Sequence, residues 1–256
     1  MPSPSYLIQA LPLQAVILAA GKGKRFPGAK PKVLQEVVGK PLITHVLALA
    51  DALGITKKIV VIGHLGEQVQ QQLSSEKNLS FVWQREQLGT GHAVKMAIPY
   101  LEKESAVLIL YGDVPALKKE TLQRLIAEHE HKKNALTILT ASLREPKWYG
   151  RILKDKEGKV LGIREAKDCS AEELQIKEIN SGIMVVESEF LFSALEKVKN
   201  TNQQGEYYLT DIVAIACHES KAVSTVVTLD EDEIKGVNSP EELAEMESIL
   251  KEREKK

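Results

Sequence analysis

The sequence predicts an α/β fold in which a mostly parallel sheet is flanked by helices and becomes mixed in its second half. Up to about residue 135, short apolar and β-branched runs alternate with helical patterns, an order typical of parallel strands joined by crossover helices. After residue 136, strand-like runs follow one another through a short turn, which favours antiparallel pairing. Because crossovers between parallel strands are almost always right-handed, few other topologies remain.

The first half of the chain contains four strand-like segments with helical patterns between and after them. We expect the strands at residues 14–20, 57–63, 79–83 and 106–113. We expect helices at residues 42–53, 66–73 and 117–131, the last of which is amphipathic. The first strand is a continuous apolar run, as is typical of a strand buried on both faces of a parallel sheet.

The second half adds strands at residues 135–143 and 179–187 and a hairpin over residues 151–165, with its turn around Glu157 and Gly158. These runs are expected to extend the first sheet as a mixed sheet. Since no internal repeat or low-complexity linker separates the halves, we expect one domain over residues 1–256, with a first lobe at about 14–135 and a second at about 136–238.

The C-terminal helix, expected over residues 239–252, has a clear start signal. Ser239 is its N-cap, Pro240 takes the first helical position and Glu242 completes a capping box. An apolar stripe follows at Leu243, Met246 and Leu250. We expect this stripe to dock on the body of the protein; the alternative is an arm that leads to another domain or subunit.

Composition limits the class of partner. The chain of 256 residues has a net charge of −1, whereas a general nucleic-acid binder would carry a broadly basic face. No run is long enough to span a bilayer, and residues 6–20 lack the basic start of a signal peptide. Cys169 and Cys217 lack the spacing of a metal or redox motif. We therefore expect a cytoplasmic protein with inert thiols and without nucleic-acid or membrane partners.

A local cluster of positive charge follows the first strand. Within residues 18–34 it comprises Lys22, Lys24, Arg25, Lys30 and Lys32, without any acid. Glycines such as Gly21 and Gly23 allow backbone amides to point at an anion. The ordinary alternative is a solvated basic turn, but this cluster lies where open α/β sheets bind ligands. We expect a polyphosphate site, in which Arg25 grips phosphate oxygens with its planar fork and Lys32, after Pro31, acts as a point charge.

Two common phosphate-binding templates do not match this loop. A P-loop needs a lysine directly after its last glycine, and Ala29 follows Gly28. The dinucleotide-binding fingerprint needs a glycine where Phe26 stands. The loop is therefore neither a standard ATPase loop nor a typical NAD site.

Asp113 and Asn238 are candidate metal ligands. Asp113 ends the predicted fourth strand and stands too far before the next helix to cap it. Asn238 could also be the N-cap of the last helix, but Ser239 fits the N-cap position better, which leaves the Asn238 side chain available as a ligand. One carboxylate, one amide oxygen, waters and ligand phosphates make a plausible Mg²⁺ shell.

Several motifs together resemble one family closely. They are "QREQLGTGHA", "LYGDVP", "WYGRI", "EINSGI", "GEYYLTDIV" and "KGVNSP". With the basic loop, they resemble the uridyltransferase (pyrophosphorylase) domain of the bifunctional N-acetylglucosamine-1-phosphate uridyltransferase/glucosamine-1-phosphate acetyltransferase, over about residues 15–247. The resemblance implies a Rossmann-like nucleotidyltransferase fold and Mg²⁺-dependent synthesis of UDP-N-acetylglucosamine, a peptidoglycan precursor of the cell wall, from UTP and N-acetylglucosamine 1-phosphate. The two lobes would then bind the nucleotide and the sugar.

The same resemblance implies a set of site residues. Nucleotide contacts fall on Leu18, Ala19, Ala20, Gly21, Gln84, Gly89, Thr90, Tyr111 and Gly112, sugar contacts on Gly150, Glu165 and Asn180, and the metal on Asp113 and Asn238. Gln84 can both donate to and accept from the uracil edge, and Gly89 permits close approach of a flat base. Thr90 has a second interpretation, as the cap of a helix that begins near His92, and both stay open.

The chain also departs from the family pattern. Lys24 stands where a small hydroxyl residue is common, the loop "FPGAKPK" carries an extra proline and glycine, and Ala166 replaces a usual histidine. The family's second half, a left-handed β-helix of hexapeptide repeats, is not in this sequence. The acetyltransferase activity and the trimer built on that half are expected to be absent, and the oligomeric state stays open. Two alternatives remain: a related nucleotidyltransferase for another sugar 1-phosphate or NTP, and a non-catalytic nucleotide-sugar sensor.

Overall fold

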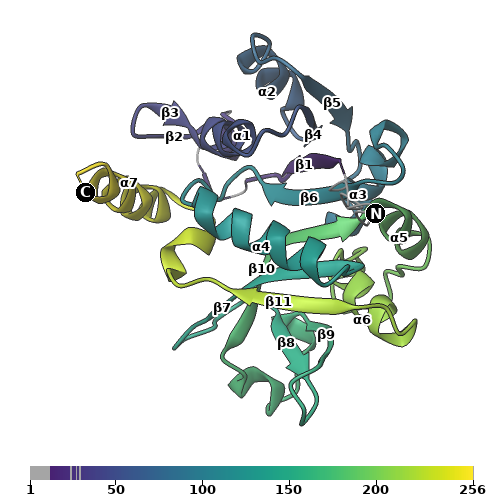
Figure 1. The fold of residues 1–256 in the computed structure, drawn as a ribbon. Helices are drawn as coiled ribbons and strands as arrows, with labels where there is room; N and C mark the ends of the chain where they lie inside the picture. The colour runs from purple at the N-terminus through teal and green to yellow at the C-terminus, as the bar shows by residue number, and fades with distance from the viewer. Residues whose placement is uncertain (1–11, 24, 27, 29, 256) are drawn as a thin grey trace, which may run out of the picture.

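A computed structural model describes residues 12–23, 25–26, 28 and 30–255 of the protein. Among these residues, nine strands form one sheet (Figure 1). They are β1 (Leu13–Ala19), β4 (Lys57–Ile62), β5 (Leu79–Trp83), β6 (Ala106–Tyr111), β7 (Leu136–Ser142), β8 (Arg151–Lys154), β9 (Val160–Arg164), β10 (Glu178–Glu187) and β11 (Val223–Val227). The order is β11-β7-β10-β6-β1-β4-β5, with β8 paired to β10 and β9 paired to β8.

Strand directions confirm the mixed, mostly parallel sheet. β1 is parallel to β4 and β6, β4 is parallel to β5, and β7 is parallel to β11. β10 runs antiparallel to β6 and β7, and β8 and β9 form the predicted hairpin. The register pairs Leu18 with Tyr111, so the loop after β1 and the residues after β6 leave the sheet at the same edge.

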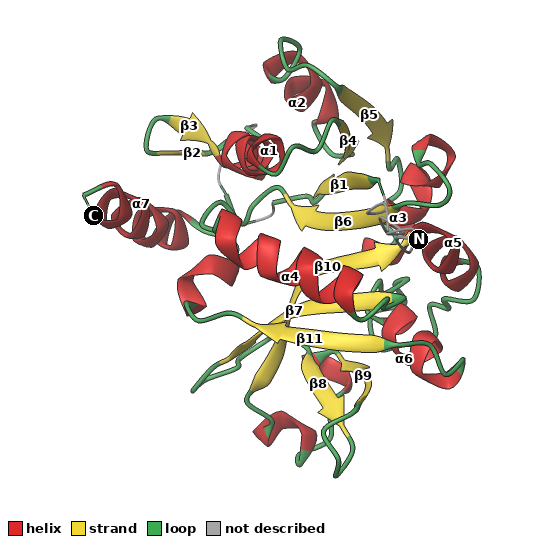
Figure 2. Ribbon diagram, viewed as in Figure 1, coloured by secondary structure: helices red, strands yellow, loops and turns green. Residues whose placement is uncertain are grey.

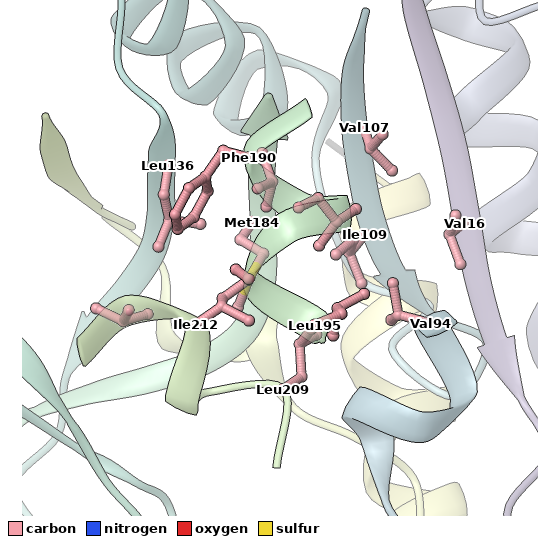
Figure 3. Close-up of a cluster of buried hydrophobic side chains, with 14 of the residues drawn as sticks. Val16, Val94, Val107, Ile109, Leu136, Met184, Phe190, Leu195, Leu209 and Ile212 are labelled. Carbon is pink, nitrogen blue, oxygen red and sulfur yellow. The ribbon is translucent and has the colours of Figure 1, made fainter. Parts of the chain in front are cut away.

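Helices cover both faces of the sheet (Figure 2). The helices α1 (Leu42–Ala52), α2 (Gly66–Gln72) and α4 (Lys119–His131) bury their apolar sides against one face. The helices α3 (Thr90–Ala97), α5 (Ser188–Leu195) and α6 (Asp211–His218) cover the other. Side chains alternate between the faces along each strand. In Figure 3, Ile109 and Met184 from the sheet pack with Val94, Leu195 and Ile212 from the three helices of the second face.

Every strand and helix that the sequence predicts is present, but the structure also contains several short elements that the sequence did not predict. The missed elements are β11, α5, α6 and a two-stranded hairpin formed by β2 (Glu36–Val37) and β3 (Lys40–Pro41). β11 has only five residues and forms an edge of the sheet, where its pairing with β7 decides its conformation. A segment this short carries too few residues for a periodic signal.

The C-terminal helix α7 (Pro240–Glu254) has the predicted N-cap: Ser239 Oγ accepts a hydrogen bond from the Glu242 amide at 3.3 Å. The predicted capping box is displaced, because the Glu242 carboxylate accepts the amide of Asn238 and not that of Ser239. The stripe of Leu243, Met246 and Leu250 packs with Val37 of β2 and with Val237. The stripe therefore docks on the body, beside the β2–β3 hairpin (Figure 1). Within the described ranges, every helix is too short or too polar to cross a membrane.

Candidate active site

A cavity of about 520 Å³ opens at the sheet edge where β1 and β6 end. That volume is within the range of small-molecule sites. The predicted residues on its wall are Leu18, Ala19, Ala20, Gly21, Lys32, Gln84, Gly89, Thr90, Tyr111, Asp113 and Asn238. Lys22, Gln87 and Glu206 also line it, and sequence reasoning assigned no role to Gln87 or Glu206.

Lys32 joins the two candidate metal ligands. Its Nζ donates to the Asp113 carboxylate and to Asn238 Oδ1, the latter at 2.8 Å. The Lys32 and Asp113 side chains are only 15% and 14% exposed, so this pair is little screened by solvent. The ammonium group thus lies between one carboxylate and one amide oxygen, two hard oxygen donors that also suit a small divalent cation.

No group of three or more His, Cys, Asp or Glu side chains in the described part of the chain could hold a metal. Asp113 and Asn238 would therefore need further ligands from waters or substrate. This requirement fits a cation whose remaining ligands are waters and phosphate oxygens of the substrate, which is how Mg²⁺ is commonly bound.

The basic loop is less uniform than its sequence indicates. Lys30 Nζ pairs with Glu36 Oε1 at 2.8 Å on the surface, and Arg25 is exposed and does not line the cavity. Lys24, Pro27 and Ala29 lie outside the described residues. Of the predicted cluster, Lys22 and Lys32 line the cavity. An acid that is distant along the chain, Asp113, neutralises the better buried of the two.

Gly23 shapes the loop. Its φ of +56° is in the left-handed region, and a Cβ at this position would lie 3.0 Å from Lys32 Cβ. The Phe26 amide donates to the Gly23 carbonyl at 3.0 Å, which closes a turn. Glycine at this position therefore lets the loop fold back against Lys32.

One end of the cavity is built around Gln84, which is only 3% exposed. Gln84 Nε2 donates to the Gly89 carbonyl at 3.0 Å and to His92 Nδ1 at 3.1 Å, so the orientation of the amide is held from two sides. Gly89 has φ +113°, and its missing Cβ would lie 2.5 Å from the Tyr207 carbonyl oxygen. The close approach that requires glycine here is that of the Tyr207 backbone.

Thr90 does not cap a helix. The helix α3 begins at Thr90 itself, with Gly89 as the N-cap and without a side-chain capping bond. Thr90 Oγ1 instead accepts the Leu209 amide at 3.1 Å. The capping interpretation is therefore wrong. The "GEYYLTDIV" segment, through Tyr207 and Leu209, supports the loop that carries Gly89 and Thr90.

The predicted sugar contacts also converge. The Asn180 amide donates to the Gly150 carbonyl at 2.9 Å, and a Cβ on Gly150 would lie 3.5 Å from Glu165 Oε2. Thr210 Oγ1 donates to Glu165 Oε1 at 2.9 Å. Burial raises the pKa of the Glu165 carboxyl, and the nearby acid Asp211 adds to the rise.

Tyr111 connects this group to the cavity. Its ring packs against Gly182, where a Cβ would lie 2.6 Å from the ring. Burial, with the Glu165 and Asp113 carboxylates, raises the pKa of the Tyr111 hydroxyl, which therefore stays neutral. Gly112 does not line the cavity, and a Cβ on it would lie 3.2 Å from Val33 Cγ1. Gly150, Glu165 and Asn180 do not line the cavity either.

Comparisons with known proteins agree with this architecture. The family model of the MobA-like NTP transferase domain matches residues 15–178. Two curated proteins, each named "Bifunctional protein GlmU", are 48% identical to this chain: that of Syntrophotalea carbinolica over 94% of the chain and that of Trichlorobacter lovleyi over 93%. The alignments cover 52% of each relative, so the chain spans about half the length of the curated relatives it matches.

A solved structure shares the fold. The structure of UDP-glucose pyrophosphorylase complexed with UDP-glucose superposes with a TM-score of 0.75, covering 94% of this chain and 98% of that one. Its sequence identity is 17%, so the similarity concerns the fold. This agrees with the expected Rossmann-like nucleotidyltransferase fold.

Proposed function

This chain belongs to the family of the MobA-like NTP transferase domain, and from that membership together with its sequence motifs we propose that it transfers UMP from UTP to N-acetyl-α-D-glucosamine 1-phosphate, giving UDP-N-acetylglucosamine and pyrophosphate. The motifs around Gln84, Asp113, Asn180 and Asn238 support this choice of substrates. The observation that carries the proposal is the convergence of Lys32, Asp113 and Asn238 on the wall of one cavity.

The chemistry needs charge compensation more than proton transfer. A phosphate oxygen of the sugar phosphate, already an anion near neutral pH, attacks the α-phosphorus of UTP. A new P–O bond forms, and the bond between the α-phosphorus and the bridging oxygen breaks, so that its electron pair leaves with pyrophosphate. Positioning and electrostatic stabilisation are the effective means of catalysis in such transfers.

Lys32 supplies a positive charge at the point where the two candidate ligands meet, and Lys22 and the loop after β1 supply further charge and backbone amides. Arg25 is exposed and does not line the cavity; we assign it to the outer phosphates, at the open side of the site. Asp113 and Asn238 would hold Mg²⁺ in place of the Lys32 ammonium that contacts them here, and Lys32 would then face the phosphates. When bound, Mg²⁺ supplies positive charge and Lewis acidity to the phosphate oxygens.

Binding at the two ends of the substrates is assigned to different residues. Gln84, with its amide held by Gly89 and His92, is assigned to the uracil edge together with Gly89 and Thr90. Glu165, Asn180 and the Gly150 backbone are assigned to the amino sugar. We assign the nucleotide lobe to about residues 14–135 and the sugar lobe to about 136–238, in one cytoplasmic unit.

A substrate panel tests the proposal. Pyrophosphate release is measured with each of UTP, dTTP, CTP, ATP and GTP against N-acetylglucosamine 1-phosphate and glucose 1-phosphate, with Mg²⁺ and with a chelator. We expect release with UTP and N-acetylglucosamine 1-phosphate, and its loss with the chelator. Faster release with another pair would change the substrate assignment. Binding of UDP-N-acetylglucosamine by calorimetry without release in any mixture would indicate the sensor alternative.

A further inference from the structure

Every polar group of Asn238 except its backbone carbonyl has a defined partner. Its side-chain Nδ2 donates to the Gly236 carbonyl at 3.2 Å, and its Oδ1 accepts from Lys32 Nζ at 2.8 Å. Its backbone amide donates to Glu242 Oε2 at 2.6 Å. The direction in which the amide oxygen points is therefore set by contacts on three sides.

The chain around Asn238 is held from two elements. The preceding amide, that of Val237, donates to the backbone carbonyl of Asp113 at 2.9 Å. On the other side, Pro240 restricts Ser239 to extended backbone, with φ −141° and ψ 164°. Two successive amides are thus fixed: that of Val237 by Asp113 and that of Asn238 by Glu242 in the first turn of α7.

Glu242 makes an unusual variant of the capping box. In the ordinary box, the third helical residue accepts the amide of the N-cap. Here Ser239 is the N-cap and accepts the Glu242 amide, but the Glu242 carboxylate reaches one residue further back, to Asn238. This displacement by one residue places the carboxylate on the backbone of the residue whose side chain faces the cavity.

We propose that Glu242 is a positioning residue for the cation site: it holds the Asn238 backbone so that Oδ1 points toward Lys32 Nζ, which also contacts Asp113. The inference rests on the proposed function, since it assigns a supporting group to the same site. Groups that orient metal ligands from behind typically change metal affinity 10- to 100-fold when they are removed.

Glu242 is not needed to attach α7 to the body. Met246 of this helix is buried in the apolar contact with Val37 and Val237, and Glu247 Oε2 accepts the Val38 amide at 2.7 Å. Near the end of the helix, Arg253 donates to Asp230 at 2.8 Å. The loss of one carboxylate in the first turn therefore leaves the helix docked.

Three substitutions in the full chain separate positioning from capping. E242A removes the acceptor, E242Q keeps an acceptor oxygen but no charge, and S239A removes the N-cap while keeping Glu242. Two readouts are used: the Mg²⁺ concentration for half-maximal pyrophosphate release, and Mn²⁺ binding to the protein saturated with UDP-N-acetylglucosamine, followed by the EPR signal of free Mn²⁺.

We expect E242A to weaken both metal readouts about tenfold, with E242Q close to the wild type. S239A is expected to lower the Tm, because an N-cap is lost, and to leave both metal readouts unchanged. If E242A fails to fold, E242M replaces it. Unchanged readouts in E242A, equal losses in E242A and S239A, or equal losses in E242A and E242Q would each overturn the positioning role.

D113A distinguishes failure of the positioning role from failure of the cation site. If D113A abolishes Mn²⁺ binding while E242A does not weaken it, the positioning role fails and the cation site stands. If D113A itself leaves Mn²⁺ binding unchanged, the cation site fails, and the proposed function loses its metal assignment.

Discussion

Lys32 Nζ lies 2.8 Å from Asn238 Oδ1, although 206 residues separate the two along the chain. The lysine follows the first strand, and the asparagine precedes the last helix. Both reach the same point because β1 and β6 end at one edge of the sheet and α7 packs beside the β2–β3 hairpin. The contact joins the phosphate loop to the candidate cation site, so each should respond to changes in the other.

Removal of the Lys32 charge should slow the reaction. We expect Lys32→Ala to lower kcat/KM for UTP by about 10²-fold, because a preorganised charge that acts on the phosphates is lost. Lys32→Arg keeps the charge, but its planar fork differs in geometry from an ammonium, so partial activity is expected. Circular dichroism controls for folding. A wild-type rate in Lys32→Ala would return the loop to the role of a solvated turn.

Asp113→Ala should reduce turnover by at least about 10²-fold while the fold is kept. The Asp113 backbone carbonyl, which accepts the Val237 amide, survives this substitution, so the contact between the two segments should persist. Glu157→Ala, in the exposed turn between β8 and β9, removes a carboxylate that does not line the cavity and serves as the matched control. Pyrophosphate release by Asp113→Ala near that of the control would contradict the metal assignment.

Glu165 should affect the sugar substrate and leave UTP binding largely unchanged. We expect Glu165→Ala to raise KM for the sugar phosphate about 10- to 100-fold, because one hydrogen bond to a charged group is lost. Because burial raises the pKa of this carboxyl, it becomes protonated at a higher pH than an ordinary glutamate. The affinity for the sugar phosphate should therefore fall as the pH decreases through that raised pKa. A larger effect on KM for UTP would place Glu165 elsewhere in the reaction.

Gly89 and Gly158 differ in the space that an added Cβ would have. Both have positive φ, but a Cβ on Gly158 would meet nothing within 4 Å, whereas one on Gly89 would meet the Tyr207 backbone. Gly158→Ala should cost about 1–2 kcal/mol of unfolding free energy. Gly89→Ala should cost about 3 kcal/mol or more, because overpacking adds to the strain. Urea unfolding compares them, and equal costs would show that the contact with Tyr207 is unimportant.

His129 should make stability depend on pH. It is 3% exposed, and burial lowers its pKa from 6.5 to about 4. Between pH 6.5 and 4 the unfolded chain binds a proton at this histidine that the folded chain does not bind. The free energy of unfolding is therefore at its full value above pH 6.5 and decreases as the pH falls toward 4. The loss should reach about 3 kcal/mol by pH 4. His129→Gln should lack this component, and an identical pH profile of unfolding in the variant would contradict the assignment.

Sequence patterns succeeded where local rules decide the structure. The long apolar strands, the helix α4 and the Ser239 start of α7 follow from periodicity, burial and capping, which act within a few residues. The position of the basic loop and of Asp113 at one sheet edge follows from the strand order. Patterns failed for Thr90, whose hydroxyl contacts Leu209 rather than its own helix, and for the short edge strand β11.

The amino-acid sequence by itself determined the longer strands and helices, but not β11, α5, α6 or the β2–β3 hairpin. It also determined that glycine, lysine and aspartate would stand at the carboxyl ends of the first and fourth predicted strands. Tertiary structure alone decided that Lys32 would contact Asp113 and Asn238, and that Tyr207 would lie against Gly89. The physical reason is range: propensities and caps act between neighbours, whereas these contacts join residues that only the packed sheet and its helices bring together.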